Sequence, residues 1–254
     1  MRKQIVPLLT ILLILAFSSS AFAHFGMLIP EKSIITPEKK KTEVQLSFSH
    51  PFELVGMDLV KPKKFSVFYD GKETDLLSSL KKTRIMGHDS FKTEYKVKRP
   101  GMYTFYMEPV PYPEPAEDNY IIHYTKTVVS AFNEGEEWNK PLGVKTEIVP
   151  LTRPWGNYAG NVFQGIVLLD GKPAPFTRVE VEFYNKDGKL EAPYECMVTQ
   201  EVLCDENGVF TFACPKAGWW GFAALNDADY KIKGKDVELG AVLWIEMVPF
   251  KTSK

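Results

Sequence analysis

FKTEYKVKRPGMYTFYMEP, residues 91–109, is the stretch that indicates the fold of this 254-residue chain. Apolar and polar residues alternate with a period of two on both sides of Pro100-Gly101, a dipeptide typical of turns. A helix would instead place apolar residues three and four positions apart. The stretch therefore predicts two β-strands joined by a turn.

The same period continues in both directions along the first half of the chain. TEVQLSFSH (42–50) and YIIHYTKTVVSAF (120–132) read as strands, and KKFSVFYDGKE (63–73) reads as a strand that enters an Asp70-Gly71 turn. Long helical patterns are scarce. The second half repeats the arrangement at 160–189, 205–226 and 237–250.

We therefore predict an all-β protein made of two antiparallel β-sandwich domains of Ig-like or prealbumin-like type. The predicted domains are residues 24–152 and 156–254, and VPLTRPWGNYAG (149–160) marks the boundary, with Trp155 expected to be buried. Around Asn207-Gly208, MVTQEVLC (197–204) is expected to pair antiparallel with VFTFAC (209–214). The second half resembles small prealbumin-like sandwich modules of exported proteins.

The first 23 residues have the features of a signal peptide. Arg2 and Lys3 precede the apolar run IVPLLTILLILAF (5–17), and Ala21-Phe22-Ala23 supplies a small-x-small cleavage pattern. The run is too short to span a bilayer as a helix. We expect a soluble periplasmic protein whose mature chain begins at His24.

Composition excludes two classes of partner. The formal net charge is −1 and the basic residues are scattered, so we expect neither nucleic-acid nor membrane-surface binding. With 44% hydrophobic residues, the chain is able to bury a core. The sequence contains neither a nucleophile elbow nor paired carboxylates at a diagnostic spacing, so we predict a protein without catalytic residues.

An N-terminal histidine is a potential metal chelate. The α-amine of His24 and its Nδ1 atom can close a six-membered ring on one ion. Both groups lose their protons near neutral pH, since their ordinary pKa values are about 7.7–8.0 and 6.5. Nitrogen donors suit Ni(II), Co(II), Cu(II) and Zn(II) rather than Ca²⁺ or Mg²⁺.

All four histidines lie in the first predicted domain, and the other three are candidate ligands. His50 and His123 fall on inward faces of predicted strands, where each is either a hydrogen-bonded core residue or a ligand. His88 follows a glycine in a predicted loop or bulge. The acidic stretch EPVPYPEPAEDNY (108–120), which includes Glu114, reads as a solvated loop or as a negative collar that attracts cations toward His123.

Several stretches resemble a known family of exported proteins, the periplasmic components of nickel/cobalt uptake systems, long catalogued as a domain of unknown function. The stretches are AHFGMLIP (23–30), HPFE (50–53), IIHYTK (121–126), DGKPAPFTRVEVEFYN (170–185) and DENGVFTFACPKAGWWGFAAL (205–225). The resemblance implies that His24, His50, His88 and His123 bind Ni(II) or Co(II) and deliver the ion to an energy-coupling-factor-type transporter.

Two readings remain open beside this one. An N-terminal histidine with a second histidine also forms the copper brace of copper carriers and of oxidative polysaccharide-cleaving enzymes. A purely structural module is the other alternative. The three cysteines, Cys196, Cys204 and Cys214, are too far apart in a regular hairpin to pair, because disulfides need Cα atoms within about 7 Å. We expect free thiols unless a bulge permits a Cys196–Cys214 bridge.

Overall fold

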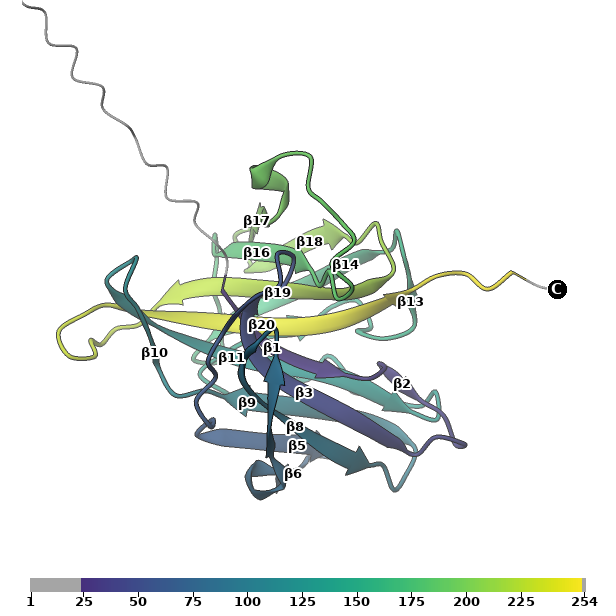
Figure 1. The fold of residues 1–254 in the computed structure, drawn as a ribbon. Helices are drawn as coiled ribbons and strands as arrows, with labels where there is room; N and C mark the ends of the chain where they lie inside the picture. Colours follow the sequence, from purple (N-terminus) through teal and green to yellow (C-terminus); the bar gives the residue numbers. More distant parts are fainter. Residues whose placement is uncertain (1–23, 253–254) are drawn as a thin grey trace, which may run out of the picture.

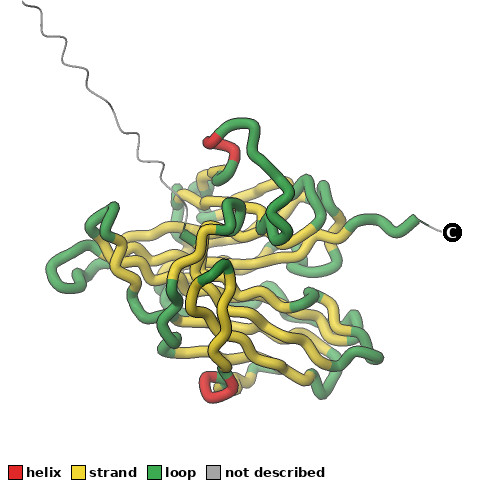
Figure 2. The backbone as a smooth tube through the Cα atoms, in the orientation of Figure 1, coloured by secondary structure: helices red, strands yellow, loops and turns green. Residues whose placement is uncertain are grey.

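The structure, a computed structural model, describes residues 24–252, so the predicted signal peptide lies outside the described residues. Strands dominate the described part of the chain, and its only helices are two short 3₁₀ turns, η1 (Leu77–Ser79) and η2 (Glu195–Met197) (Figure 2). Neither turn comes near the length and apolar character that crossing a membrane would require. The predicted all-β sandwich class is confirmed.

The centre of the fold is one large sheet that contains strands from both halves of the sequence (Figure 1). Its main path runs through β17 (Gln200–Leu203), β16 (Arg178–Phe183), β19 (Gly218–Asp227), β20 (Val237–Val248), β11 (Asn119–Ala131), β9 (Gly101–Glu108), β5 (Lys64–Tyr69) and β6 (Lys72–Asp75). Three short strands pair alongside this path: β2 (Ile34–Ile35), β10 (Tyr112–Glu114) and β13 (Asn157–Tyr158).

Strands β11 and β20 join the two halves, and they run parallel. Their register extends from Tyr120 opposite Val237 to Thr127 opposite Trp244. This pair is an exception to the antiparallel arrangement that we expected throughout. The sequence does not reveal it, because a period of two indicates the buried face of a strand but not its partner or direction.

Two smaller sheets cover opposite faces of the large one. The first contains β1 (Phe25–Pro30), β3 (Lys41–His50), β4 (Val55–Met57), β7 (Lys81–Ile85) and β8 (His88–Lys96). The second contains β12 (Thr146–Pro150), β14 (Val162–Leu169), β15 (Lys172–Pro173) and β18 (Val209–Ala213). One core therefore lies between the first small sheet and strands β9 and β11, where Leu46 packs with Phe105. The other core lies between the second small sheet and strand β19, where Phe163 packs with Phe222.

Local turn predictions are confirmed, while one predicted strand pairing is wrong. Asp70 and Gly71 have φ values of 50° and 68° and close the β5–β6 hairpin as expected. The two strands predicted within residues 91–109 are also present, but β8 pairs with β3 and β7 while β9 pairs with β5 and β11, so the turn at residues 100–101 connects two sheets.

The Asn207-Gly208 turn is also a corner between sheets. Strand β17 pairs with β16 and β18 pairs with β14, so the predicted pairing of 197–204 with 209–214 is wrong. The Asp205 carboxylate accepts hydrogen bonds from the N–H groups of Asn207 and Val209, which stabilises the turn without a strand ladder. All three cysteines are free, as expected, with Cys196 exposed and Cys204 and Cys214 buried.

The segment between the predicted domains is packed against the rest of the molecule. Trp155 is 3% exposed, which confirms its expected burial. Strand β12, just before this segment, pairs with β14 just after it, and β13 pairs with the distant β20. These contacts tie the connection to both halves of the chain.

Candidate metal centre

Three of the four candidate histidines meet where β1 begins and β3 ends. His24 directly precedes β1, and the antiparallel register that pairs Phe25 with Ser49 places it beside His50. The ring centroids of His24 and His50 are 4.6 Å apart. The Phe48 ring lies 5.5 Å from the His24 ring and 5.8 Å from the His123 ring. The structure thus brings together residues that lie up to 99 positions apart in the sequence.

Glu114 determines how the His24 ring is oriented. Its Oε2 atom lies 2.9 Å from His24 Nε2, and the carboxylate is 7% exposed. The other carboxylate oxygen accepts the backbone N–H of Ala116, which fixes the acid in place. A neutral imidazole that donates from Nε2 carries its free lone pair on Nδ1. Glu114 therefore leaves Nδ1 of His24 available to a metal ion.

The surroundings keep the His24 ring neutral. Burial, and after it the neighbouring His50, lower the pKa of His24 from 6.5 to about 4, while Glu114 acts in the opposite direction. The charged imidazolium is disfavoured because burial deprives it of water. A proton therefore competes only weakly with a metal ion for this ring at neutral pH.

His123 serves mainly to anchor β1. It is 2% exposed, its Nδ1 accepts the N–H of Gly26 at 3.2 Å, and its Nε2 lies 3.4 Å from Glu238 Oε1. Both ring nitrogens are thus engaged. The C=O of Gly26 accepts the indole N–H of Trp244 at 2.8 Å. The N–H and the C=O of Gly26, two residues after His24, are therefore both hydrogen-bonded.

Two glycines without side chains make room for the residues around the His123 ring. A Cβ atom on Gly240, opposite His123 in β20, would lie 2.2 Å from His123 Cδ2. On the other side, a Cβ atom on Gly26 would lie 2.3 Å from Thr125 Oγ1. Glycine inside a strand often marks such a close approach, so Gly240 is a sequence signal that would have indicated it.

His88 occupies a different environment. It begins β8 after the Met86-Gly87 turn, and its ring packs over Gly56 in β4. Its Nδ1 lies 3.2 Å from Asp58 Oδ1, and its side chain is 43% exposed. His88 is thus hydrogen-bonded to Asp58 at the surface, whereas the other three rings are buried or mostly buried.

The side chains alone do not complete a metal site. Within residues 24–252, no group of three or more His, Cys, Asp or Glu side chains is arranged so that it could hold a metal ion. The nitrogen of His24 is here part of a peptide bond to Ala23 and is not a metal donor. Cleavage after Ala23 would convert it to an amine next to Nδ1, which supplies the donor that the side chains lack.

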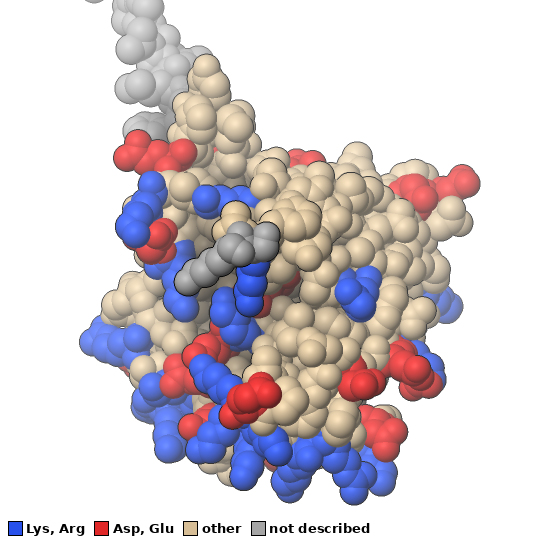
Figure 3. Space-filling model, turned by 90° about the vertical axis from the view of Figure 1, so that its right-hand side faces the viewer, with Lys and Arg blue, Asp and Glu red and all other residues tan. Residues whose placement is uncertain are grey.

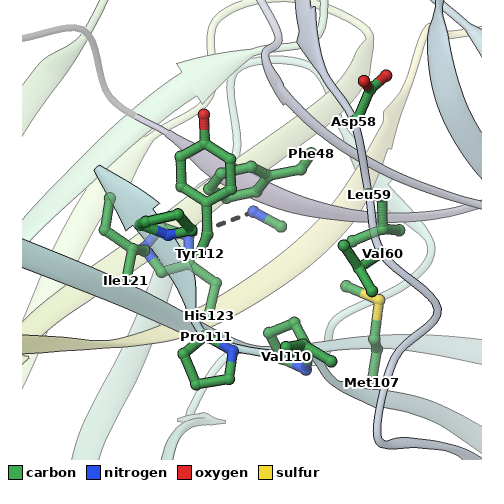
Figure 4. A pocket seen from close by; sticks show the side chains of 13 residues that line it. Phe48, Asp58, Leu59, Val60, Met107, Val110, Pro111, Tyr112, Ile121 and His123 are labelled. Carbon is green, nitrogen blue, oxygen red and sulfur yellow. Dashed lines mark hydrogen bonds between the residues drawn. The ribbon is translucent and has the colours of Figure 1, made fainter. Parts of the chain in front are cut away.

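An apolar cavity of about 50 Å³ adjoins the cluster (Figure 4). Phe48, Tyr112 and His123 line one side, and the dashed line marks the hydrogen bond from Gly26 to His123. Val60 and Met107 line the other side. The aromatic rings reduce the contact of the site with water, which strengthens its electrostatic interactions.

The sequence indicated only one of the two carboxylates that contact the histidine cluster. Glu114 belongs to the acidic stretch that reads from the sequence as a solvated loop or as a negative collar near His123, but it is buried and contacts His24. Glu238 comes from the second half of the sequence and was missed, because only the parallel pairing of β11 with β20 brings it to His123.

Charge of both signs covers the outer surface. On the face shown in Figure 3, Lys and Arg gather along the lower part, with Asp and Glu among them. Exposed pairs such as Lys41–Glu94 and Lys92–Glu43 lie on neighbouring β3 and β8. Exposed pairs of this kind contribute at most about 1 kcal/mol each.

The fold and the cluster define an all-β sandwich protein with a buried group of histidines at the start of its first strand. The chain belongs to the family described as "Domain of unknown function (DUF4198)", whose profile matches residues 21–228. A search of curated proteins finds no match.

Solved structures offer only distant likenesses. Escherichia coli alpha-2-macroglobulin shares 10% identity over 89% of this chain, with a TM-score of 0.24, and the chain spans 14% of that protein. The D00-D0 domain of intimin shares 7% identity over 89% of this chain and 100% of its own, with a TM-score of 0.22. Titin Ig tandem domains A164-A165 share 10% identity over 90% of this chain and 100% of their own, with a TM-score of 0.19. No functional inference follows from likenesses this weak.

Proposed function

We propose that this protein is an exported, non-enzymatic carrier of Ni(II) or Co(II) that supplies a membrane uptake system from the periplasm. One observation carries the proposal. The His24 ring is held through Nε2 by Glu114 with the His50 ring 4.6 Å away, so Nδ1 of the first mature residue remains free for a metal. The resemblance of the sequence to nickel/cobalt uptake components also supports it.

The proposed ion is cargo, held by nitrogen donors. The α-amine and Nδ1 of His24 form the chelate, and the His50 imidazole supplies a third nitrogen. Glu114 acts on the ion through the His24 ring, since a carboxylate on the second ring nitrogen makes an imidazole a better ligand. His123 positions the chelate indirectly, because it holds Gly26 in β1.

Ion release would follow from competition for these donors. A partner that offers its own ligands, such as an energy-coupling-factor-type transporter, would take over the ion stepwise. Protons compete as well, because a metal-binding amine and imidazole must both be deprotonated.

A copper carrier with the same brace is the second candidate. An amine and two imidazoles fit the square-planar or tetragonal geometry of Cu(II), and the Irving–Williams order gives Cu(II) the highest affinity for such donors. Under the nickel/cobalt proposal, the selection of Ni(II) or Co(II) over Cu(II) in the cell then depends on metal supply and on the partner. Metal analysis of the protein isolated from its native periplasm distinguishes these two candidates.

The decisive experiment compares two N-termini. Protein that begins at His24 and protein that retains Ala23 are titrated with Ni(II) by calorimetry, and circular dichroism verifies that both are folded. Retention of Ala23 should weaken binding by at least about tenfold, because it removes the amine donor. Equal affinities for the two forms would rule out the proposed chelate.

Side-chain variants of the His24 form test the remaining roles. His50→Ala should weaken Ni(II) binding strongly. Glu114→Gln should weaken it about 10–100-fold, the usual effect of losing an outer-shell carboxylate. His88→Ala is the matched control, since His88 lies in the Asp58 ion pair, and it should bind Ni(II) normally. Loss of Ni(II) binding in this variant would mean that His88 belongs to the ligand set, contrary to the proposal.

A further inference from the structure

A second cavity lies on the opposite face of the large sheet from the histidine cluster. Its volume is about 600 Å³, within the common range of about 300–1,000 Å³ for small-molecule sites. Strands β5, β9 and β11 form its floor, and the loop of residues 133–145 forms a wall. Successive residues of a strand point to opposite faces, so Lys126 of β11 lines this cavity while His123 faces the cluster.

Lys126, at the floor of the cavity, belongs to a buried ion pair. Lys126 Nζ lies 2.5 Å from Glu147 Oε2, and the two side chains are 4% and 3% exposed. Taking two charges out of water costs several kcal/mol per ion before their attraction offsets it. The attraction between the two charges therefore contributes little net stability.

The same pair connects the floor to the loop. Glu147 also accepts the N–H of Leu142 at 3.0 Å and that of Gly143 at 2.9 Å. The carboxylate thus holds the loop in position over the cavity. An ammonium has three donors, and within residues 24–252 the Lys126 ammonium donates to Glu147 alone. Since Lys126 also lines the cavity, a ligand there could accept from its remaining donors.

The walls and the rim indicate what kind of ligand fits. Phe68, Tyr69 and Trp138 are half-buried aromatic residues that line the cavity. At the rim, Asp70 and Glu136 are exposed acids, and the exposed Glu137 is paired with Lys140 at 2.6 Å.

Charge disfavours ionised ligands. An anion would face the acidic rim, and the Lys126 ammonium is already neutralised by Glu147. A cation would find no free carboxylate at the floor, because Glu147 is occupied by Lys126 and by two backbone N–H groups. An uncharged molecule with several hydroxyl groups needs no charged partner, because its hydroxyls accept from Lys126 and its apolar C–H faces pack on the aromatic rings.

We infer that this cavity binds a neutral carbohydrate of one or two sugar units, independently of the proposed metal site. Trp138 stacks on the sugar face, and Lys126, which Glu147 holds in place, recognises hydroxyl groups at the floor. Metal binding and sugar binding occur on opposite faces of the sheet, so each is expected to persist when the other is abolished.

The test uses the folded protein and five sugars as probes. Glucose, N-acetylglucosamine and cellobiose represent neutral ligands, and glucuronate and glucosamine represent an anion and a cation. Saturation-transfer NMR and calorimetry measure binding at millimolar concentrations. At least one neutral sugar should bind, and more tightly than either charged sugar. No binding of any neutral sugar, or tighter binding of a charged one, would overturn the inference.

Variants locate the binding. Trp138→Ala should weaken binding of the neutral sugar about tenfold, and Trp138→Phe should restore most of it. Tyr194→Ala is the matched control, because Tyr194 is 71% exposed and lies in the separate loop that contains η2. A Lys126→Met/Glu147→Gln double variant, which leaves no unpaired charge buried, should also lose binding. Unchanged affinity in folded Trp138→Ala would place the sugar elsewhere.

Discussion

The substitution Glu182→Gln tests how the large sheet tolerates a buried carboxyl group. Glu182 lies in β16 and is 1% exposed. Its Oε1 atom accepts the hydroxyl hydrogen of Thr199, and its Oε2 accepts the N–H of Phe52 at 3.3 Å. Burial nevertheless dominates and raises the pKa of Glu182 from 4.5 to about 8. The folded protein therefore holds a proton on this group at neutral pH.

The size of the effect follows from that pKa. The difference between about 8 in the folded chain and 4.5 in the unfolded chain amounts to about 5 kcal/mol, at about 1.36 kcal/mol per pKa unit. Between these values the folded state binds more protons than the unfolded state. The contribution to stability is therefore fully present below pH 4.5 and is lost as the pH rises through 8.

Glutamine removes this dependence while it keeps the shape of the side chain. Its carbonyl oxygen can accept the Phe52 N–H, and its amide can donate to the Thr199 hydroxyl oxygen. Urea unfolding at pH 5 and pH 9 should show the variant close to wild type at pH 5 and more stable at pH 9, by up to about 5 kcal/mol.

Glu201→Gln is the control for this measurement. Glu201 lies across from Glu180 in β17 and its side chain is 55% exposed, so its substitution should change stability little at either pH. If the difference between Glu182→Gln and wild type is the same at pH 5 and pH 9, Glu182 titrates as an ordinary exposed acid and the burial argument fails.

Three further predictions concern the histidine cluster and the thiols. Gly240→Ala places a Cβ atom against His123, so it should destabilise the protein by about 1–3 kcal/mol in urea unfolding and weaken Ni(II) binding; wild-type behaviour in both would refute the close approach. Cu(II) should displace Ni(II) from the protein that begins at His24 in a competition monitored by absorbance, and failure to displace it would argue against an amine–imidazole donor set. A thiol reagent should label Cys196 in the native protein and Cys204 and Cys214 only after unfolding, because burial raises the pKa of those two thiols to about 11 and about 12; fewer than three labelled thiols in the unfolded protein would contradict free cysteines.

Local features of the candidate site were accessible from the sequence. Alternation along 42–50 and 120–132 predicted that His50 and His123 point inward, and both are buried. The role of His123 was not accessible, because a buried imidazole in a strand has the same sequence pattern whether it binds a metal or a backbone N–H. The Gly26 contact distinguishes the two, and it depends on how β1 crosses β11.

The amino-acid sequence by itself determined the longer alternating strands, such as those at 42–50 and 120–132, the Asp70-Gly71 hairpin and the buried faces of these strands, since all of these follow from neighbouring residues and from the side-chain period of a strand. The pairing of β11 with β20, the separation of β17 from β18, the Glu114 contact to His24 and the cavity above Lys126 were decided only by the tertiary structure. A strand exposes the same backbone donors and acceptors to every candidate neighbour. Its partner is therefore selected by the packing of side chains that are far apart in the chain.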